Sequence, residues 1–318
     1  MRENPLFSVI TVSYNSGQFV GSTIESVLSQ SFGEMEYIIG DDCSTDDTWD
    51  IIQQYHDERI KVYRNDRNLG EYANRNKALS VAKGDYVIFI DGDDIMYHYA
   101  LETYSYYISH FPECGMICSR QWDNRIIYPF LADPLTVYRF EYLDTSIVGG
   151  NFTKVLFKRN AILEAGKFPS HIRTGDYYIQ LKIALHHPAL AINDGLTWWR
   201  RRSNNASSRL FRDNRYIAEY LIYRTAFLDD KACPLPEKEK IRARNNLYGI
   251  CLRTILRMIV QLKFSEVYFL LKKITIPPSF YGAVFIKSRF DYFKDIKGDN
   301  PLHTRIASES ILSISNKI

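Results

Sequence analysis

The sequence has few cysteines, and none are paired at the spacing that metal sites and redox motifs use. Their number is odd, and no Cys-X-X-Cys pair occurs: the five are Cys43, Cys114, Cys118, Cys233 and Cys251. A disulfide framework or a zinc cluster is therefore not expected. Isolated, reduced thiols of this kind favour a cytoplasmic protein.

Long hydrophobic runs are also missing. No segment reaches about 18 uncharged apolar residues, the length that a membrane-spanning helix requires. We therefore expect no transmembrane helix. The start of the chain, residues 1–5, leads directly into a strand pattern and shows no signal-peptide pattern.

An excess of charge of one sign is absent as well. A formal net charge of +3 over 318 residues is too small to indicate a nucleic-acid partner. The chain has no glycine-rich phosphate loop near its amino end, which a metal-dependent nucleotidyltransferase usually has. Aromatic residues are plentiful, with 23 tyrosines and 18 phenylalanines, and they suit a cleft that binds rings.

The amino-terminal third alternates between short, apolar, β-branched runs and helical patterns. Such an order produces right-handed βαβ units, so it predicts an α/β fold with a parallel sheet and helices on both faces. Strands are expected at residues 6–14, 35–40, 60–64 and 85–91, and helices at residues 19–30, 49–55 and 71–82. Further on, residues 121–145 contain two prolines and no clear period, which predicts loops and short strands.

Carboxylates follow two of these expected strands at the point where each strand ends. Asp41 and Asp42 end the second, and Asp91-Gly92-Asp93-Asp94 ends the fourth. Ligands of open α/β sheets bind at this edge. Oxygen ligands here suit Mg²⁺ or Mn²⁺ with a substrate diphosphate, and a carboxylate can also accept hydrogen bonds from ribose or a base N–H. A solvated acidic turn and helix capping remain the alternatives.

Two later groups carry similar chemistry. Asp176 lies at or near the amino end of an expected helix, either as a simple N-cap or as a functional acid. The run from Trp198 to Arg202 is dense in planar and cationic side chains. Arginine matches phosphate oxygens in bidentate fashion, whereas the alternative is a basic surface over buried tryptophans.

The chain also carries a series of motifs in a fixed order. They are Val9–Asn15, Ile38–Asp46, Asn68–Gly70 with Arg75–Ala78, Phe89–Asp94, Gly175-Asp176, and Arg200 with Ser207. In this order and spacing, the chain resembles the family 2 glycosyltransferases of bacterial polysaccharide synthesis over residues 5–210.

The resemblance implies a GT-A fold, an α/β fold whose nucleotide-binding and acceptor halves share one Rossmann-type mixed sheet with helices on both faces. It implies inverting transfer of a sugar from a nucleoside-diphosphate sugar, preferably a UDP-sugar, with Mg²⁺ or Mn²⁺ as cofactor. On this basis residues 1–225 form the GT-A domain, with halves at residues 1–97 and 98–225. Residues 226–318 form a helical carboxyl-terminal region.

The resemblance also implies a role for each matching residue. Asp176 would be the catalytic base, Asp93 the metal ligand, and Asp94 a supporting residue that shapes the site. The expected nucleotide-sugar-binding residues are Tyr14 beside the base, Asn15, Asp42 at uracil or ribose, Arg75, Asp91 at the ribose, Gly92, and Arg200 and Arg202 at the diphosphate.

Two positions depart from the family pattern. Gly175 stands where an acid usually precedes the base, and Arg202 stands where many relatives place a histidine that can touch the metal. A guanidinium has no lone pair to offer a metal, so Arg202 is expected to neutralise the pyrophosphate instead.

The carboxyl-terminal region mixes large apolar side chains with cations. Residues 248–273 and 280–293 are apolar but threaded with lysine and arginine, which outnumber the acids. A basic amphipathic helix can lie on an anionic membrane surface, here beside a lipid-linked acceptor. The alternative is a helical bundle packed on the catalytic domain or on a partner subunit, and a homo-oligomer is left open.

The sequence thus favours a hexosyltransferase-type, inverting enzyme of cell-surface polysaccharide synthesis. It would act in the cytoplasm, or peripherally at the inner face of the membrane, on a saccharide or lipid-linked acceptor. The alternative is a non-catalytic nucleotide-sugar-binding or interaction module on the same fold. The acids at Asp42, Asp91, Asp93 and Asp176 favour the enzyme, whereas the departures at Gly175 and Arg202 keep the alternative open.

Overall fold

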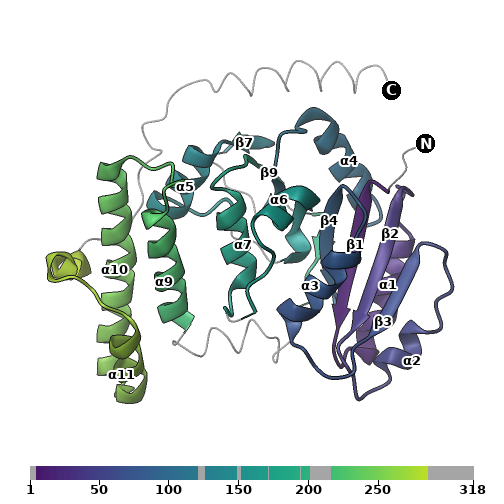
Figure 1. Ribbon diagram of the computed structural model, residues 1–318, viewed down its shortest axis with the longest axis horizontal. Coiled ribbons are helices and arrows are strands. Elements are labelled where there is room, and N and C mark those ends of the chain that lie inside the picture. Colours follow the sequence, from purple (N-terminus) through teal and green to yellow (C-terminus); the bar gives the residue numbers. More distant parts are fainter. Residues whose placement is uncertain are drawn as a thin grey trace.

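The computed structural model describes residues 5–120, 126–148, 152–170, 172–193, 195–200 and 216–285. Its centre is an eight-stranded sheet in the order β3-β2-β1-β4-β8-β6-β9-β7, and β5 pairs with β10 separately (Figure 1). The strands are β1 (Phe7–Ser13), β2 (Met35–Asp41), β3 (Ile60–Arg64), β4 (Tyr86–Asp91), β5 (Ile95–Met96), β6 (Met116–Arg120), β7 (Phe130–Ala132), β8 (Val155–Lys158), β9 (Ala189–Asn193) and β10 (Thr197–Trp198).

Helices cover both faces of this sheet, as predicted. One core lies between the sheet and α1 with α4, and the other lies between the sheet and α3 with α7. The helices are α1 (Gly17–Leu28), α2 (Thr48–Ile52), α3 (Glu71–Val81), α4 (Ala100–His110), α5 (Pro134–Leu143), α6 (Arg159–Glu164), α7 (Gly175–Ile183), α9 (Tyr216–Asp229), α10 (Glu237–Val260) and α11 (Phe264–Lys273), with short 3₁₀ turns η1 (Phe152–Lys154) and η2 (Pro278–Phe285).

Successive side chains along the central strands point to opposite faces of the sheet, and this alternation produces the two cores. Val9 and Ile88 are fully buried on the α1 side, whereas their chain neighbours Ile10 and Phe89 are buried on the α3 side. Strands buried on both faces read as continuous apolar runs, and β-branched residues pack well on such a surface. The four expected strands of the amino-terminal third are therefore confirmed.

The sheet is mixed because β8 runs in the opposite direction to its two neighbouring strands. Strands β3, β2, β1 and β4 are parallel, β8 is antiparallel to both β4 and β6, and β9 is parallel to β6. The predicted α/β fold with a GT-A-like mixed sheet is confirmed. The parallel half carries the acidic strand ends, and the mixed half leads to the carboxyl-terminal helices.

The stretch between residues 126 and 145 differs from the prediction. In place of loops and short strands alone, it contains β7 and the ten-residue helix α5. The Asp133 carboxylate accepts a hydrogen bond from the Thr136 N–H at 2.8 Å, and Pro134 occupies the first helical position. Both are favourable at a helix start, so the proline that suggested a loop instead begins a helix.

Two of the carboxyl-terminal helices, α9 and α10, pack on α5. Helix α9 runs through residue 225, the expected domain boundary, and one side of α10 joins the core through Ala243, Leu247 and Cys251. Arg139 of α5 and Glu239 of α10 form a bidentate ion pair with both N–O distances at 2.9 Å. Among the helices within the described ranges, each is too short or too polar to traverse a bilayer.

Candidate active site

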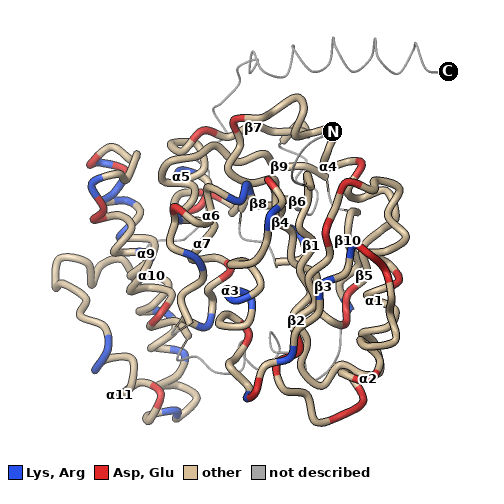
Figure 2. The backbone as a smooth tube through the Cα atoms, turned by 45° about the vertical axis from the view of Figure 1, so that its right-hand side comes forward, with Lys and Arg blue, Asp and Glu red and all other residues tan. Residues whose placement is uncertain are grey.

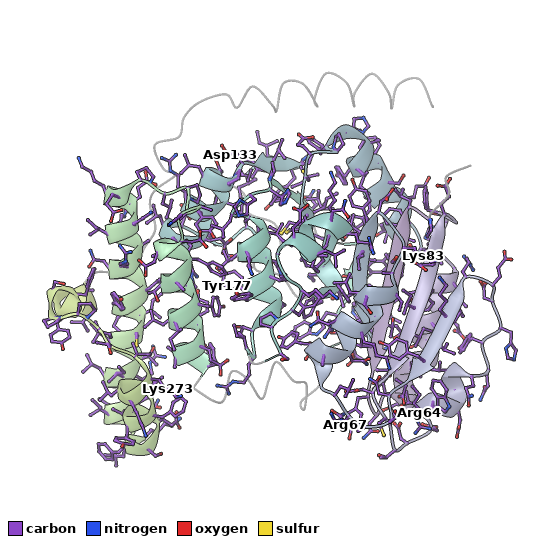
Figure 3. All side chains as sticks on the ribbon, in the orientation of Figure 1. Arg64, Arg67, Lys83, Asp133, Tyr177 and Lys273 are labelled. Carbon is purple, nitrogen blue, oxygen red and sulfur yellow. The ribbon has the colours of Figure 1, made fainter. Side chains whose placement is uncertain are left out.

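The two acidic strand ends lie side by side at one edge of the sheet. Ser13 pairs with Asp41 across β1 and β2, and Val12 pairs with Asp91 across β1 and β4. Figure 3 shows Arg64, the last residue of β3, at this lower edge and Lys83 toward the opposite one. The predicted acids therefore meet where a parallel sheet presents its ligand-binding edge.

Tyr14 and Asn15 follow β1 at this edge. Asn15 has a positive φ of 49°, its Oδ1 accepts the Thr45 N–H at 2.9 Å, and its own N–H donates to Ser44 Oγ at 2.9 Å. It thus ties the loop after β1 to the loop after β2. The Tyr14 side chain is 49% exposed, so its ring is accessible at the rim.

Asp42 is buried and organises the loop that leads into α3. Its Oδ1 accepts hydrogen bonds from Leu69 N–H at 2.9 Å and Asn65 Nδ2 at 2.8 Å, and its Oδ2 accepts from Gly70 N–H at 2.9 Å. Three donors occupy most of the acceptor capacity of one carboxylate. Asp42 therefore fixes this loop, and its expected contact with the nucleoside stays a prediction.

Arg75 lies under the site, with 1% of its side chain exposed. Its guanidinium is ion-paired with Glu71 and with Asp91, and it lies 4.1 Å from the centroid of the Phe152 ring. A buried cation needs such partners because it has lost its hydration. Arg75 thus orients Asp91, whose side chain is 37% exposed and can face a ligand.

The Asp91–Asp94 turn is held by Arg200. The Arg200 N–H donates to Asp94 Oδ1 at 3.0 Å, and its Nε donates to the Asp93 carbonyl at 2.8 Å. The guanidinium also packs 4.5 Å from the Phe19 ring and 4.7 Å from the Trp198 ring. Within this turn, a Cβ on Gly92 would lie 3.0 Å from Ser13 Oγ, so a larger residue would press on β1.

The acids of this turn destabilise one another's charge. Desolvation and the neighbouring carboxylate of Asp91 raise the pKa of Asp94 to about 8, and desolvation raises the pKa of Asp91 to about 6 despite its bond to Arg75. Asp94 is fully buried, and its Oδ2 has no hydrogen-bond partner among the described residues. A nearby positive charge would relieve both effects.

A divalent cation fits this donor set. Within the described ranges, no three acidic, histidine or cysteine side chains converge on one point. A cation here would therefore use one or two carboxylates, with Asp93 at the partly exposed position, and complete its shell with water and diphosphate oxygens. This is the usual mode of Mg²⁺ in phosphate-transfer sites, and Mn²⁺ accepts the same ligands.

Asp176 lies in the first turn of α7. The N-cap position is Thr174, so the interpretation of Asp176 as a simple N-cap does not hold. Its Oδ1 accepts the Tyr177 N–H at 2.8 Å. Desolvation by burial and, to a smaller extent, the negative charge of Glu71 raise the pKa of this carboxyl to about 6, which is the range of a general base at neutral pH.

Helix α3 connects Asp176 to the acidic edge. Glu71 raises and Arg75 lowers the pKa of Asp176, and Arg75 is also the ion-pair partner of Asp91. Asp176 and Asp91 thus lie within electrostatic reach of the same two residues. The sequence reading missed Glu71 and Tyr72 as site residues, although both stand between two of its motifs.

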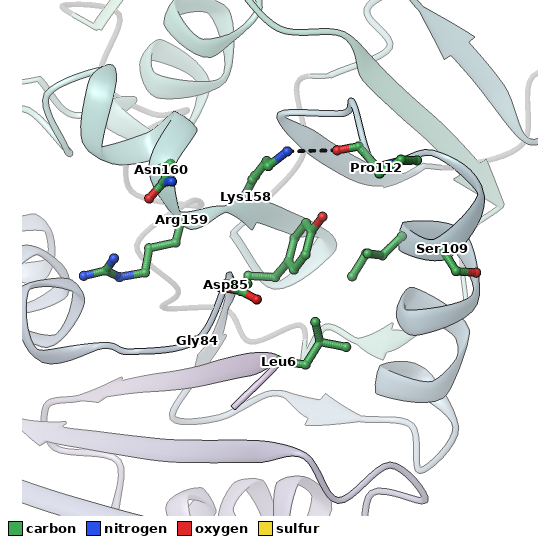
Figure 4. Close-up of a pocket in the computed structure, with 10 residues that line it drawn as sticks. Leu6, Gly84, Asp85, Ser109, Pro112, Lys158, Arg159 and Asn160 are labelled. Atoms are coloured by element: carbon green, nitrogen blue, oxygen red, sulfur yellow. Dashed lines mark hydrogen bonds between the residues drawn. The ribbon is translucent and has the colours of Figure 1, made fainter. Parts of the chain in front are cut away.

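A cavity of about 360 Å³ lies elsewhere, at the amino end of β4 (Figure 4). Its lining includes Leu6, Tyr86 and Lys158, whose Nζ donates to the Pro112 carbonyl at 2.9 Å. None of the expected site residues lines it. Arg202 lies outside the described residues, so its expected place at the pyrophosphate stays a prediction.

The family model for "Glycosyl transferase family 2" matches residues 8–164. Residues 8–164, about half of the chain, belong to glycosyl transferase family 2. Curated relatives that share 42% to 54% identity with this family 2 chain are matched over only about a third of their own length. One is WfaP of Escherichia coli, a UDP-Glc:alpha-D-GlcNAc-diphosphoundecaprenol beta-1,3-glucosyltransferase, which is 47% identical over 89 residues, or 28% of the chain and 36% of WfaP.

Solved structures extend the likeness over the whole family 2 fold. TarS of S. aureus, residues 1–349 in complex with UDP-GlcNAc, gives a TM-score of 0.64 at 20% identity, covering 87% of this chain and 81% of the solved 1–349 chain. The mannosyltransferase PcManGT from Pyrobaculum calidifontis, in complex with GDP-Man and Mn²⁺, gives 0.62 at 16% identity, covering 98% of this chain and 81% of PcManGT. At these identities the likeness shows a shared GT-A-like fold.

Proposed function

We propose that this family 2 member is an inverting, metal-dependent glycosyltransferase. It transfers a hexose from a UDP-sugar to a saccharide or lipid-linked acceptor of cell-surface polysaccharide synthesis. The observation that carries the proposal is the geometry around α3: a carboxyl with a pKa of about 6, Asp176, shares its charged neighbours with Asp91 at the acidic sheet edge. Perturbed acids that converge on one site are a signature of catalysis.

The names of similar proteins support the finer assignments. WfaP is named for UDP-Glc and for a diphosphoundecaprenol-linked acceptor, TarS was solved with UDP-GlcNAc, and PcManGT was solved with GDP-Man and Mn²⁺. The exposed Tyr14 ring suits a planar base. Tyr14 therefore stays the proposed base contact, and Asp91 the proposed ribose contact.

The proposed mechanism divides the chemistry between the two sides of α3. At the sheet edge, Asp93 and its neighbours would hold Mg²⁺ or Mn²⁺, which would supply positive charge to the departing diphosphate. Arg200 holds the Asp91–Asp94 turn in shape through the Asp94 carboxylate and the Asp93 carbonyl. On the other side, Asp176 accepts the proton of the acceptor hydroxyl as that oxygen attacks the sugar, in a single displacement that inverts the anomeric carbon.

The turnover test uses UDP-, GDP- and dTDP-sugars with Mn²⁺ and measures released nucleotide. We expect slow UDP release even without acceptor, because a site that activates a hydroxyl also admits water. The rate should fall as the pH drops through about 6, since protonated Asp176 cannot accept a proton and its pKa is raised to about 6. With an unperturbed carboxyl as the base, the rate would instead stay constant until the pH fell to about 4.

A matched pair of variants controls this test. Glu71→Gln removes a negative charge that raises the pKa of Asp176, so the acid limb should move to lower pH. Glu58→Gln removes an exposed acid just before β3 and should leave the limb in place. If no donor releases nucleotide at any pH, the non-catalytic nucleotide-sugar-binding module is the better interpretation.

We further propose that the enzyme binds the membrane at what we term the α10–α11 corner, residues 256–273. Seven large apolar side chains there are 41% to 82% exposed: Leu256, Ile259, Val260, Leu262, Phe264, Tyr268 and Leu271. Four cations, Arg257, Lys263, Lys272 and Lys273, accompany a single acid, Glu266. An anionic membrane surface would accommodate both kinds of residue: the apolar side chains would insert among the lipid headgroups, and the cations would pair with the anionic lipids.

The position and charge of the corner favour a membrane over a second copy of the chain. Figures 1 and 2 place α11 on the same lower side as the carboxyl ends of β1 and β2, and Figure 3 shows Lys273 low on that side with Arg64 and Arg67. Binding there would turn the catalytic edge toward a lipid-linked acceptor. A symmetric contact between two copies would instead bring like charges together.

Vesicle flotation tests the corner. The full-length chain should float with phosphatidylglycerol-containing vesicles at low salt and less at high salt, because ionic screening weakens the attraction. Val260→Asp with Leu262→Asp should leave the protein in the soluble fraction, whereas Ile241→Asp, at an exposed position near the start of α10, should still float. Equal flotation of all three, or none by wild type, would contradict the proposal. If the corner variant alone has a lower molecular mass in solution than wild type, the partner of the corner is instead a second copy of the chain.

A further inference from the structure

Two hydrogen bonds join α3 to the turn that precedes Asp176. The Tyr72 hydroxyl accepts the Gly175 N–H at 2.9 Å and donates to the Arg173 carbonyl at 2.9 Å. A single phenol therefore binds the backbone on both sides of Thr174. Because the hydroxyl acts once as donor and once as acceptor, both bonds are lost together when it is removed.

Gly175 lies against the face of the same ring. A Cβ at this position would be 2.9 Å from Tyr72 Cζ, 3.0 Å from Cε1 and 3.2 Å from Cε2. The ring is itself packed, stacked on Phe168 at 6.2 Å and edge-on to Phe152 at 5.9 Å. Gly175 begins α7 and has no left-handed backbone angle, so glycine is needed here for space and not for conformation.

We propose that Tyr72 is a positioning residue for Asp176 and that Gly175 makes its contact possible. The proposal rests on the proposed function, in which Asp176 is the base. Tyr72 stands in the first turn of α3, beside Glu71 and one turn before Arg75. The same helix thus fixes Asp91 at the sheet edge and the turn that carries the base on the other side, which sets the distance between them.

The same contact explains the departure at position 175. The acid usual before the base cannot fit there while the Tyr72 ring lies at contact distance. The phenol instead anchors the turn through two backbone bonds and adds no charge beside Asp176. Its own pKa is raised by burial and by the negative charge of Asp176, so it stays a neutral donor at any working pH.

Tyr72→Phe is the first test, because it keeps the ring and removes both bonds. We expect kcat to fall roughly 10- to 100-fold with little change in KM for the donor, since a small misplacement of a catalytic group has effects of that order. The acid limb of the pH profile should move to lower pH, because a looser turn leaves the Asp176 carboxyl better hydrated. A merely structural role would lower the melting temperature without moving this limb.

Tyr55→Phe is the matched control. Its hydroxyl, on the segment after α2, also bonds a backbone carbonyl, that of Gly21 in α1 at 3.2 Å, away from Asp176. This variant should keep both kcat and the pH limb. Carbon-13 NMR of the Asp176 carboxyl gives a reading that needs no activity: its pKa should fall in Tyr72→Phe and stay in Tyr55→Phe. If the pKa of Asp176 is unchanged in Tyr72→Phe, the positioning role is overturned. If that pKa shifts but the wild-type protein has no transferase activity, only the proposed function is refuted.

A double-variant cycle tests the fit between the two positions. Gly175→Ala should lower kcat because its methyl group meets the ring, and this loss should largely disappear when Tyr72 is leucine. The effect of Gly175→Ala in the Tyr72→Leu background should therefore be much smaller than in wild type. Equal effects in both backgrounds would show that Gly175 acts independently of Tyr72 and would overturn the proposed pairing.

Discussion

Replacing Asp176 with asparagine is expected to lower kcat for sugar transfer by at least about 10²-fold, while the donor nucleotide still binds. General-base assistance is typically worth about 10²–10⁴-fold, and an amide cannot accept the acceptor's proton. Asparagine has nearly the same size, and its carbonyl oxygen can still accept the Tyr177 N–H that Asp176 accepts. The turn should therefore persist, and the loss should appear in the chemical step. Single-turnover transfer rates and calorimetric binding of UDP measure the two effects separately.

The control for this variant is Asp133→Asn. Asp133 also lies at a helix start, where its carboxylate accepts the Thr136 N–H, but it is at the beginning of α5. Asparagine is a good N-cap, so both kcat and stability should remain close to wild type. If Asp176→Asn loses nucleotide binding along with activity, Asp176 has a structural role, and the assignment of the base must be given up.

Replacing Asp93 with alanine is expected to abolish the metal dependence of nucleotide binding. Losing even a residue that only supports a metal ligand typically costs 10–100-fold in metal affinity or activity, so losing the ligand itself should weaken binding of UDP with Mn²⁺ by about ten-fold or more. Wild type should bind UDP more tightly with Mn²⁺ than without it. The variant should bind equally under both conditions, because the diphosphate then has no bridging charge. Titration calorimetry with and without Mn²⁺ reads this difference directly.

Asp50→Ala serves as the comparison, since Asp50 is an exposed acid on α2 and is not an expected metal ligand. It should keep the full effect of Mn²⁺. An Asp93→Ala protein that binds UDP as wild type does, with the same gain from Mn²⁺, would show that the cation is held elsewhere or is not used.

The parallel half of the fold could be predicted because three of its four strands, β1, β2 and β4, are buried on both faces. Runs such as Tyr86–Ile90 are apolar throughout, and carboxylates mark the ends of two strands, β2 and β4. Strand order then places those ends together. Helix α5 could not be found in this way, since most of its residues are buried and it has no apolar stripe opposite a polar one.

The parts of the site that escaped prediction depend on packing between distant segments. Arg75 was expected at the donor, but a charged residue gives no sign in the sequence that it will be buried between two acids. Tyr72 contacts a turn about 100 residues further along the chain. No local pattern encodes that meeting, because it depends on how α3 and α7 approach each other across the same face of the sheet.

The closeness of the Tyr72 ring to Gly175 limits how this sequence can evolve. Among relatives, the two sites should be replaced together: a lineage that acquires an acid before the base must first lose the ring, and one that acquires the ring must first lose the acid. Intermediates that carry both should be rare, because each alone is tolerated and the combination is not. Correlated substitution at these two sites would then distinguish two ways of anchoring the same carboxylate.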